Sequence, residues 1–593
     1  MEQLSKKCSN YFKMLNQTSY EQDHPIKILL NQFDTDHPGL NAFELKGVQY
    51  EILAEKIDVV VWEETPFYFI NNLSRCPGFN SGSVSNWLFE RNCHIDEDAD
   101  PETWRKFKKQ QKLKLFLCCG PYCDNVHYTV SVENLVKNGM KKYYLDAEKA
   151  KIGATKEELD FLECAQRGLL AAKRICQWYA EKAYEKLKET TDPNHRKNLE
   201  LLIQSANHAP WEAPSTFFEG LNACWFARNV LGAMEGIGNC TLGRVDYLLY
   251  DLYLEDIKTG RLTKDEAYHL IKQFVLLGDN QYDKNETIEY DNDSELEMGF
   301  GLGGCDQDGN PVYNELTTMF LRAHREMNCI YPKIHARFAS DSPTEYLEEL
   351  AQDIVSGRSV MGLSCDDGII PGLIHDGRRL EDARSYETAG CWDNIVPNKE
   401  AMSCANYIYS LTVLEQAVYG PEPEYLDAGF QCTPLEEATS FEEVYQIFFT
   451  NLKQLIRWRC KAIGTYGKLA SKVNPLCLTS ALRDGSIQSK KDYTQGGSVY
   501  NKNNYAIVGF ANYVDAMLVI KKLCFDEKII SLKEFLNVVR ANWENNEDLL
   551  HQVRKCPHFG DNNSESNALS RRLHLDLCHV AEGIENEHGE TFS

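Results

Sequence analysis

The residues of this sequence that could do chemistry together are Cys391 and Asp393, in the stretch Gly390-Cys391-Trp392-Asp393. The thiol is a sulfur reagent, and the carboxylate could transfer protons. If the segment is extended, residues i and i+2 point to the same side, so both groups would face one cavity. The alternative is a buried, inert cysteine beside a surface aspartate, because the chain contains 21 cysteines.

Two kinds of cysteine chemistry fit this stretch. Cys391 could be a nucleophile assisted by one of the 15 histidines, or it could react as a radical. Spacing alone does not choose between thiolate and radical chemistry.

The elements that must position these residues alternate between helices and short strands. Thr155 and Glu158 form a capping box that opens a long helix ending near Thr190, and its apolar residues recur at helical spacing. Similar helix starts occur at Thr263, Ser342-Pro343, Ser440 and Ser531. Extended segments are expected at 57–62, 334–338, 505–510 and directly before Cys391. This alternation predicts an α/β architecture, and with no linker or repeat we expect one domain over residues 1–593.

The composition limits the partners. A net charge of −25 disfavours nucleic acid or an anionic membrane as the main partner. The N-terminal residues contain no apolar signal core, and no apolar run is long enough to span a bilayer, so we expect a cytoplasmic protein. Many cysteines in such a chain indicate reduced thiols, which suit an anaerobic cytoplasm. The cluster Cys118-Cys119-Gly-Pro-Tyr-Cys123 lacks metal-site spacing, so no metal is expected.

One glycine-rich stretch matches the dinucleotide-binding pattern but lacks the helix that should follow it. Gly299-Phe-Gly-Leu-Gly-Gly304 has dinucleotide-binding spacing, but the residues after it form a turn rather than a helix. We interpret the stretch as a glycine-rich loop.

Several blocks of the sequence, taken in order, resemble the glycyl radical enzymes of the pyruvate formate-lyase-like group. They span most of the chain, and their order is much more specific than any single block. The blocks are Pro214–Leu221, Leu242–Asp246 with Tyr250, Asp308-Gly with Asn314–Leu316, Ile370–Leu373, Glu381–Tyr386, Gly390-Cys391, Asn512–Met517, Lys521–Leu523, Arg540–Glu544 and Pro557–Gly560.

The resemblance implies both a fold and a set of site residues. The fold would be a ten-stranded α/β barrel made of two half-barrels of parallel strands, surrounded by helices, with Cys391 on a central loop. Cys391 matches the cysteine that becomes a thiyl radical and removes a hydrogen atom from substrate. Asp393 falls where eliminating and decarboxylating members have a glutamate that moves protons. His127 resembles a substrate-contacting histidine of some dehydratases. A purely structural role for His127 stays equally open. Gly390 stands where pyruvate formate-lyase has a second cysteine, so acyl transfer to coenzyme A is not expected.

The family's C-terminal Arg-Val-x-Gly-Tyr segment, whose glycine stores the radical, does not occur in this sequence. Three explanations stay open: a split enzyme, a truncated piece of a longer enzyme, or a non-catalytic scaffold. In the first, a separate glycyl radical subunit, activated by a radical SAM enzyme, supplies a protein-based radical to Cys391. No metal or organic cofactor is then expected on this chain, and a homo-oligomer is a further candidate assembly. The reaction would be elimination of water, amine or a sulfur group from a small polar substrate, with decarboxylation as the alternative.

Overall fold

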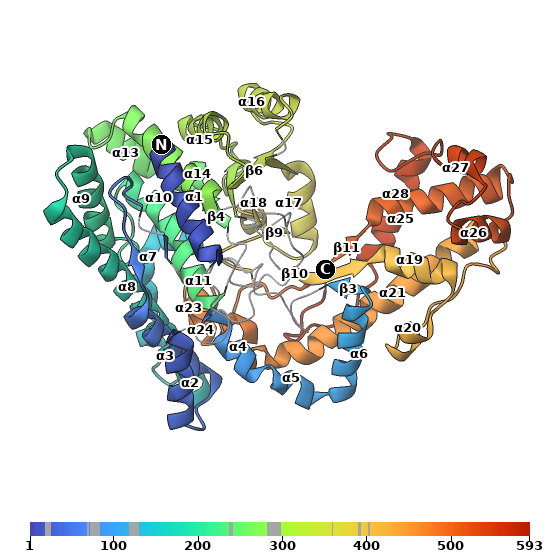
Figure 1. Cartoon of the computed structure of the whole chain (residues 1–593), viewed down its shortest axis with the longest axis horizontal. Coiled ribbons are helices and arrows are strands. Elements are labelled where there is room, and N and C mark those ends of the chain that lie inside the picture. Colours follow the sequence, from blue (N-terminus) through green and yellow to red (C-terminus); the bar gives the residue numbers. More distant parts are fainter. Residues whose placement is uncertain are drawn as a thin grey trace. The chain divides into compact units, whose positions relative to one another are not determined.

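The computed structural model describes residues 1–17, 25–67, 70–71, 84–117, 130–236, 241–281, 298–358, 360–389, 393–400 and 404–592. The chain divides into two compact units (Figure 1). The first unit contains residues 1–93, 125–402 and 470–501, and the second contains residues 94–124, 403–469 and 502–593. Whether they count as one domain, as the sequence predicts, stays a prediction.

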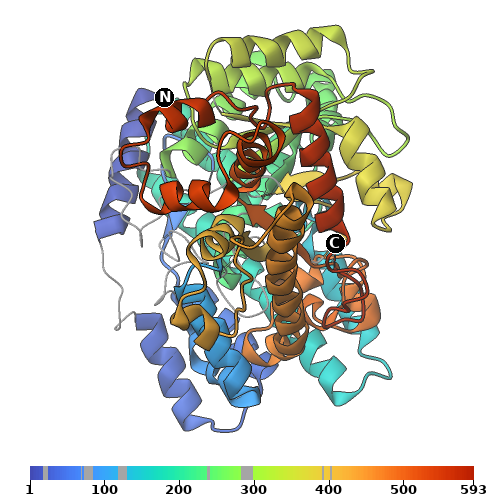
Figure 2. The same cartoon turned by 90° about the vertical axis from the view of Figure 1, so that its right-hand side faces the viewer.

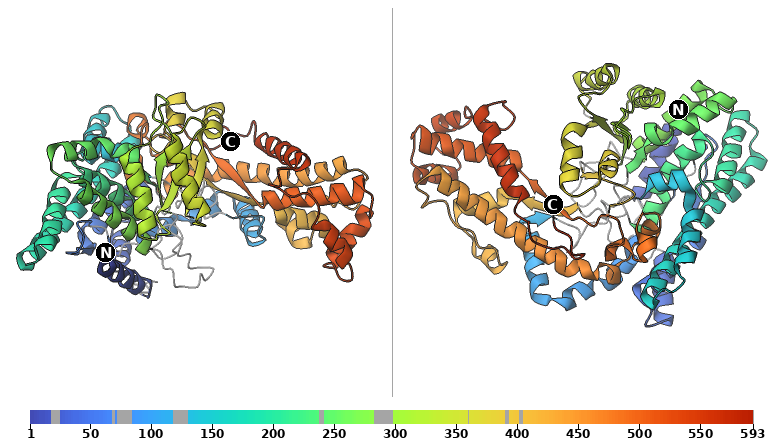
Figure 3. Two further views of the ribbon diagram at one scale, coloured as in Figure 1. Left: turned by 90° about the horizontal axis from the view of Figure 1, so that it is seen from above. Right: turned by 180° about the vertical axis from the view of Figure 1, so that it is seen from behind.

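The first unit is built around a parallel sheet in the order β4-β5-β6-β7. The strands are β4 (Thr241–Arg244), β5 (Gly299–Gly303), β6 (Lys333–Phe338) and β7 (Met361–Cys365), coloured green to yellow in Figure 3. Helices connect successive strands, as parallel pairing requires. They are α12 (Val245–Leu248), α13 (Tyr250–Thr259), α14 (Lys264–Gln281), α15 (Glu315–Glu326) and α16 (Thr344–Val355).

One face of this sheet packs against helices. The ring of Phe300 on β5 lies 5.3 Å from that of Phe320 on α15, and Phe320 lies 6.2 Å from Phe274 on α14. The opposite face carries the glycines of β5 and is covered by a two-stranded hairpin. That hairpin consists of β8 (Glu387–Ala389) and β9 (Asp393–Ile395).

Helices account for most of the rest of the first unit. The N-terminal ones are α1 (Glu2–Gln17), α2 (Pro25–Asp36), α3 (Ala42–Lys56), η1 (Val84–Asn86) and α4 (Trp87–Asn92), with the strand pair β1 (Val59–Val60) and β2 (Ile70–Asn71). The next are α7 (Val132–Ala150), α8 (Lys156–Glu189), α9 (Pro193–His208), α10 (Phe217–Phe226), the π-helix η3 (Ala227–Gly232) and α11 (Ala233–Glu235). The last are α17 (Asp366–His375), α18 (Leu380–Arg384), α22 (Ala470–Val473), α23 (Cys477–Ala481), α24 (Ser486–Ser489) and η5 (Tyr493–Gln495).

The second unit is mainly helical (Figure 2). Its small sheet has the order β11-β10-β3, with β10 parallel to β11 and antiparallel to β3. The strands are β3 (Phe116–Leu117), β10 (Cys404–Tyr409) and β11 (Asn504–Val508). The helices are α5 (His94–Ala99), α6 (Pro101–Lys112), α19 (Ser410–Tyr419), α20 (Pro423–Asp427), α21 (Phe441–Tyr466), η4 (Gly467–Leu469), α25 (Phe510–Ile520), η6 (Lys521–Asp526), α26 (Leu532–Arg540), α27 (Glu547–Val553) and α28 (Ser564–Cys578).

Most helix starts follow the sequence patterns. The Thr155 capping box opens α8, and the Ser531 box opens α26. Thr263 and Glu266 bond reciprocally before α14. The start predicted at Ser342 was wrong: Pro343 is the N-cap of α16, and the Ser342 hydroxyl accepts a bond from the Ala339 N–H.

The mixed α/β class predicted from the sequence is confirmed, with helices predominating. Closure of the strands into a ten-stranded barrel stays a prediction. In the part of the chain that the structure describes, no helix combines the length and the apolarity needed to cross a lipid bilayer.

Candidate functional site

The candidate site is organised around the β8–β9 hairpin. Ala389 pairs with Asp393 and Glu387 with Ile395 in antiparallel register, so the hairpin leads directly into and out of residues 390–392. Cys391 lies in that segment, outside the described residues. Asp393 is half-buried at the first position of β9. The prediction that Cys391 and Asp393 share one face of a single strand therefore stays untested.

The chain just before β8 is fixed by a buried arginine on β6. Arg337 bonds the Asp366 carboxylate twice, Nε to Oδ1 at 3.0 Å and Nη2 to Oδ2 at 2.8 Å. It also donates to the main-chain oxygens of Tyr386 at 2.9 Å and Arg384 at 3.0 Å. The Tyr386 hydroxyl donates to the same carboxylate at 2.7 Å. Because a bidentate pair is directional, this cluster fixes where the chain enters the hairpin.

Glu387 and Thr388 attach β8 itself to the sheet. The Arg244 N–H on β4 donates to Glu387 Oε1 at 3.1 Å. Thr388 lies 3.0 Å from the Ser364 hydroxyl on β7 and donates to Asn394 Oδ1 at 2.9 Å. The hairpin is thereby bound to both outer strands of the sheet.

Glu387 is a buried carboxylic acid with an altered proton affinity. Burial raises its pKa to about 7, while Arg244 and Thr241 oppose the rise and Glu133 adds to it. Near neutral pH, Glu387 can therefore both donate and accept a proton.

The glycines of β5 allow two long side chains to lie against the strand. A Cβ atom on Gly301 would lie 2.9 Å from Arg244 Cγ, and one on Gly299 would collide with the His335 ring. The interpretation of Gly299–Gly304 as a loop was wrong, because residues 299–303 form β5. As expected, no helix begins there to bind a phosphate; α15 starts only at Glu315.

His335 is the second buried titratable group on this face. It is 2% exposed, and neither ring nitrogen has a hydrogen-bond partner. Burial lowers its pKa to about 4, and Lys333 contributes in the same direction. The imidazole is therefore neutral at pH 7.

The sequence predicted only part of this arrangement. Of the three predicted site residues, Asp393 is described, whereas Cys391 and His127 lie outside the described residues, as does the Cys118–Cys123 cluster. Glu387, Arg244 and His335 were not predicted. The alternation of Lys333, His335 and Arg337 with apolar residues, opposite alternating glycines, could have indicated His335.

No group of three or more His, Cys, Asp or Glu side chains suited to a metal occurs within the described ranges. The prediction that this chain holds no metal stays a prediction.

Comparison with known proteins identifies the family. The profile described as "Pyruvate formate lyase-like" matches residues 111–593. The chain belongs to the pyruvate formate lyase-like family. The resemblance stated from the sequence blocks is thus confirmed.

Relatives in this family include two proteins named for elimination reactions. (2S)-3-Sulfopropanediol dehydratase of Klebsiella oxytoca is 27% identical over 451 residues, 74% of this chain and 54% of the relative. Isethionate sulfite-lyase of Nitratidesulfovibrio vulgaris is 26% identical over 440 residues, 70% of this chain and 52% of the relative. The chain thus spans about half the length of these curated relatives.

Solved structures support the fold. The glycerol-bound B12-independent glycerol dehydratase of Clostridium butyricum superposes with a TM-score of 0.84 at 19% identity. The match covers 99% of this chain and 79% of that structure. At this identity the likeness establishes the fold alone.

Proposed function

We propose that this protein is the substrate-converting part of a radical lyase that eliminates water, an amine or a sulfur group from a small polar substrate. The observation that carries the proposal is the match of residues 111–593 to the family. Relatives named as a dehydratase and a sulfite-lyase support elimination as the reaction type.

In the proposed reaction, the Cys391 sulfur removes a hydrogen atom from a substrate carbon, so one S–H bond forms and one C–H bond breaks. The neighbouring group then leaves with its bonding electron pair, and Asp393 passes to it a proton that the substrate radical releases, so that a neutral product radical remains. The product radical finally takes the hydrogen atom back from Cys391. The bonds of the hairpin to β4, β6 and β7 support a fixed position for such a centre.

The proposed site includes His127 as a substrate contact, and the proposed fold is the ten-stranded barrel of two half-barrels. A closed barrel would exclude water and other groups that quench a radical.

The radical itself would come from polypeptide outside these 593 residues, and we propose a separate glycyl radical subunit activated by a radical SAM enzyme. A glycyl radical supplies an unpaired electron that a cysteine can take up by hydrogen-atom exchange.

The test is anaerobic reconstitution of the chain with a glycyl radical protein and its activating enzyme. Candidate substrates are hydroxylated, aminated and sulfonated compounds of two to five carbons, with 4-hydroxyphenylacetate as a probe of decarboxylation. We expect elimination products only when partner and activating enzyme are both present. Turnover in air without either protein would overturn the proposal and favour a nucleophilic cysteine. The same assay tests the scaffold alternative, which predicts no turnover with any activated partner.

A further inference from the structure

An ion pair closes the base of the β8–β9 hairpin, where the chain enters it from α18 and leaves it after Ile395. Asp382 on α18 precedes the hairpin, and Lys399 follows it. Lys399 Nζ donates to Asp382 Oδ1, so the two residues are joined although they are 17 positions apart in the chain. The segment that carries Cys391 lies between them in sequence. The bond therefore links the chain before this segment to the chain after it.

A second ion pair of opposite polarity lies at the same base. Arg378, just before α18, donates to the Glu400 carboxylate, and both side chains are 5% exposed. Glu400 Oε2 also accepts the Val396 N–H at 3.2 Å. In sequence the Asp382–Lys399 pair is nested within the Arg378–Glu400 pair, which is the order expected at the base of an antiparallel hairpin.

The Asp382 carboxylate is the centre of this arrangement. It is 1% exposed, and besides Lys399 it binds the Tyr500 hydroxyl, which donates to Oδ2 at 2.6 Å. Arg379 donates to the same oxygen from Nε at 3.0 Å and from Nη2 at 2.8 Å. The Tyr500 N–H in turn donates to the Lys399 main-chain oxygen at 3.0 Å. Because hydrogen bonds between ionised groups are strong, these contacts fix the chain that leaves the hairpin.

The carboxylate keeps its charge despite its burial. Burial alone would raise the pKa of Asp382, but the hydrogen bonds from Lys399, Tyr500 and Arg379 lower it below its usual value. Asp382 is therefore ionised at neutral pH. Removing one partner of a buried ion pair leaves an uncompensated charge, so loss of either Asp382 or Lys399 should open the base of the hairpin.

The proposed chemistry makes the position of this hairpin important. A hydrogen atom passes to a sulfur only when the reacting atoms are in contact, and a displacement of about 1 Å can lower a rate about 100-fold. Arg337 fixes the chain that enters the hairpin, whereas the Asp382 cluster joins the entering chain to the leaving one. Both ends of the Cys391 segment are then held.

We propose that Asp382 is a positioning residue, which binds Lys399 and Tyr500 to close the base of the β8–β9 hairpin and so holds the Cys391 segment in place for hydrogen-atom transfer. The proposal rests on the proposed function, because it concerns the same site. Asp382 touches no substrate and moves no proton in this reaction. It acts through the hairpin.

The first measurement needs no radical. Hydrogen exchange of the hairpin is followed by mass spectrometry in the full, anaerobic, unactivated chain. Asp382→Ala removes the acceptor, and Lys399→Met keeps the length of the side chain while removing its charge. Lys399→Arg is the conservative variant, because it can still donate to the carboxylate. Lys141→Met is the matched control, because Lys141 forms an exposed ion pair with Glu212 in the same unit.

We expect the amides of residues 387–389 and 393–396 to exchange at least about tenfold faster in Asp382→Ala and Lys399→Met. Lys399→Arg should keep exchange within about threefold of the wild type, and Lys141→Met should leave it unchanged. Melting curves of each variant verify that it is folded. Exchange equal to the wild type in both folded test variants would overturn the proposal.

The second measurement is turnover in the reconstituted system, with ordinary and deuterated substrate. In Asp382→Ala and Lys399→Met, kcat per folded molecule should fall about tenfold to 100-fold, while KM stays within about threefold of the wild type. The deuterium isotope effect on kcat should increase, because hydrogen-atom transfer becomes rate-limiting. A mere loss of folded protein would leave the isotope effect unchanged. Lys399→Arg should recover most of kcat. Wild-type kcat and isotope effect in variants whose hairpin exchanges faster would overturn the positioning role.

Failure of this proposal and failure of the proposed function are distinguishable. If the wild type has no turnover with any activated partner, the proposed function fails. Faster hairpin exchange in Asp382→Ala and Lys399→Met would then still support Asp382 as the residue that holds the hairpin. Turnover by the wild type, together with unchanged exchange and kcat in both test variants, would contradict the role of Asp382 and leave the lyase intact.

Discussion

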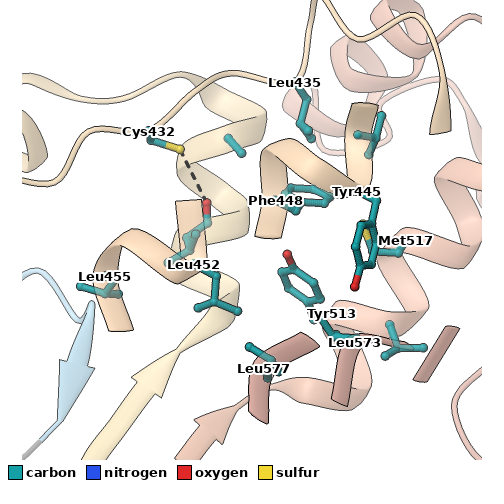
Figure 4. Close-up of a cluster of buried hydrophobic side chains, with 14 of the residues drawn as sticks. Cys432, Leu435, Tyr445, Phe448, Leu452, Leu455, Tyr513, Met517, Leu573 and Leu577 are labelled. Atoms are coloured by element: carbon teal, nitrogen blue, oxygen red, sulfur yellow. Dashed lines mark hydrogen bonds between the residues drawn. The ribbon is translucent and has the colours of Figure 1, made fainter. Parts of the chain in front are cut away.

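The glycine-lined face of the first unit and the hydrophobic core of the second unit bury side chains of opposite character. On the first, Glu387, Arg244 and His335 are buried, and Nε of Arg244 and both ring nitrogens of His335 have no hydrogen-bond partner. In the second, α21, α25 and α28 pack Phe448, Met517 and Leu573 at 2% exposure or less (Figure 4). Burial in the core stabilises by removing apolar surface from water, whereas burial of polar groups on the sheet face costs free energy because these groups lose contact with water.

Cysteines illustrate the same difference. Cys432 lies in the second unit's core, where Asn451 donates to its sulfur at 3.0 Å and burial raises its pKa to about 12. Such a thiol stays protonated and inert. Cys391 follows a hairpin strand that polar bonds attach to a sheet.

The largest effect is expected from the core. Phe448→Ala should lower the free energy of unfolding by about 3–5 kcal/mol, because it leaves a cavity in a fully buried cluster. Denaturant unfolding should give this loss equally at pH 5 and pH 8. Phe559→Ala, at a side chain that is 47% exposed, should cost less than about 1 kcal/mol. A loss of unfolding free energy that changed strongly with pH would contradict the view that the core of the second unit is stabilised by apolar burial alone.

The Glu387→Gln variant should become more stable than the wild type as the pH rises. The usual Glu pKa of 4.5 is raised to about 7, so the folded protein keeps a proton that the unfolded chain releases. Stability from Glu387 therefore falls between about pH 4.5 and 7, and the variant should gain up to about 3 kcal/mol at pH 8. Thermal unfolding at pH 5 and pH 8 measures the change. Equal stability of variant and wild type at both pH values would show that Glu387 titrates normally.

His335→Gln should have the opposite pH dependence. Because the pKa is lowered from 6.5 to about 4, the unfolded chain takes up a proton that the folded protein does not. Stability from the neutral imidazole is therefore lost as the pH falls from about 6.5 to 4, by up to about 3 kcal/mol. As the pH is lowered to 4.5, the melting temperature of the variant should rise relative to that of the wild type. A shift of the opposite sign would indicate a protonated, paired histidine.

The smallest effect is expected at a helix end of the second unit. Ser531→Ala removes the capping box of α26 and should cost about 1 kcal/mol, independently of pH between 6 and 8. Ser531→Asp, which can still accept the Glu534 N–H, should retain most of the stability. A cost above that of Phe448→Ala would mean that caps rather than core packing stabilise this unit.

Local signals in the sequence predicted much of the fold. Capping boxes at Thr155 and Ser531 mark helix starts because both partners lie within four residues of each other. The strands at 334–338 and 505–510 were predicted as short extended segments between helices, and β6 and β11 cover most of them. The strand at 299–303 was missed, because alternating glycines suggest a turn until an arginine and a histidine are placed against them.

The site was predicted less completely than the fold. Glu387 is bound by Arg244, which is 143 residues earlier in the chain, so no local pattern joins them. His335 faces glycines on another strand, and its burial depends on the sheet rather than on its neighbours in sequence. Cys391 and Asp393 were singled out by residue type and spacing and His127 by family resemblance, which also gave all three their roles. Those roles stay predictions.

The most direct test of the central claim compares two cysteines in the reconstituted, anaerobic system. Cys391→Ala should abolish product formation with little change in melting temperature. Cys432→Ala should lower the melting temperature and keep turnover per folded molecule near the wild-type value. Full turnover by Cys391→Ala, in protein shown to be folded, would contradict the account.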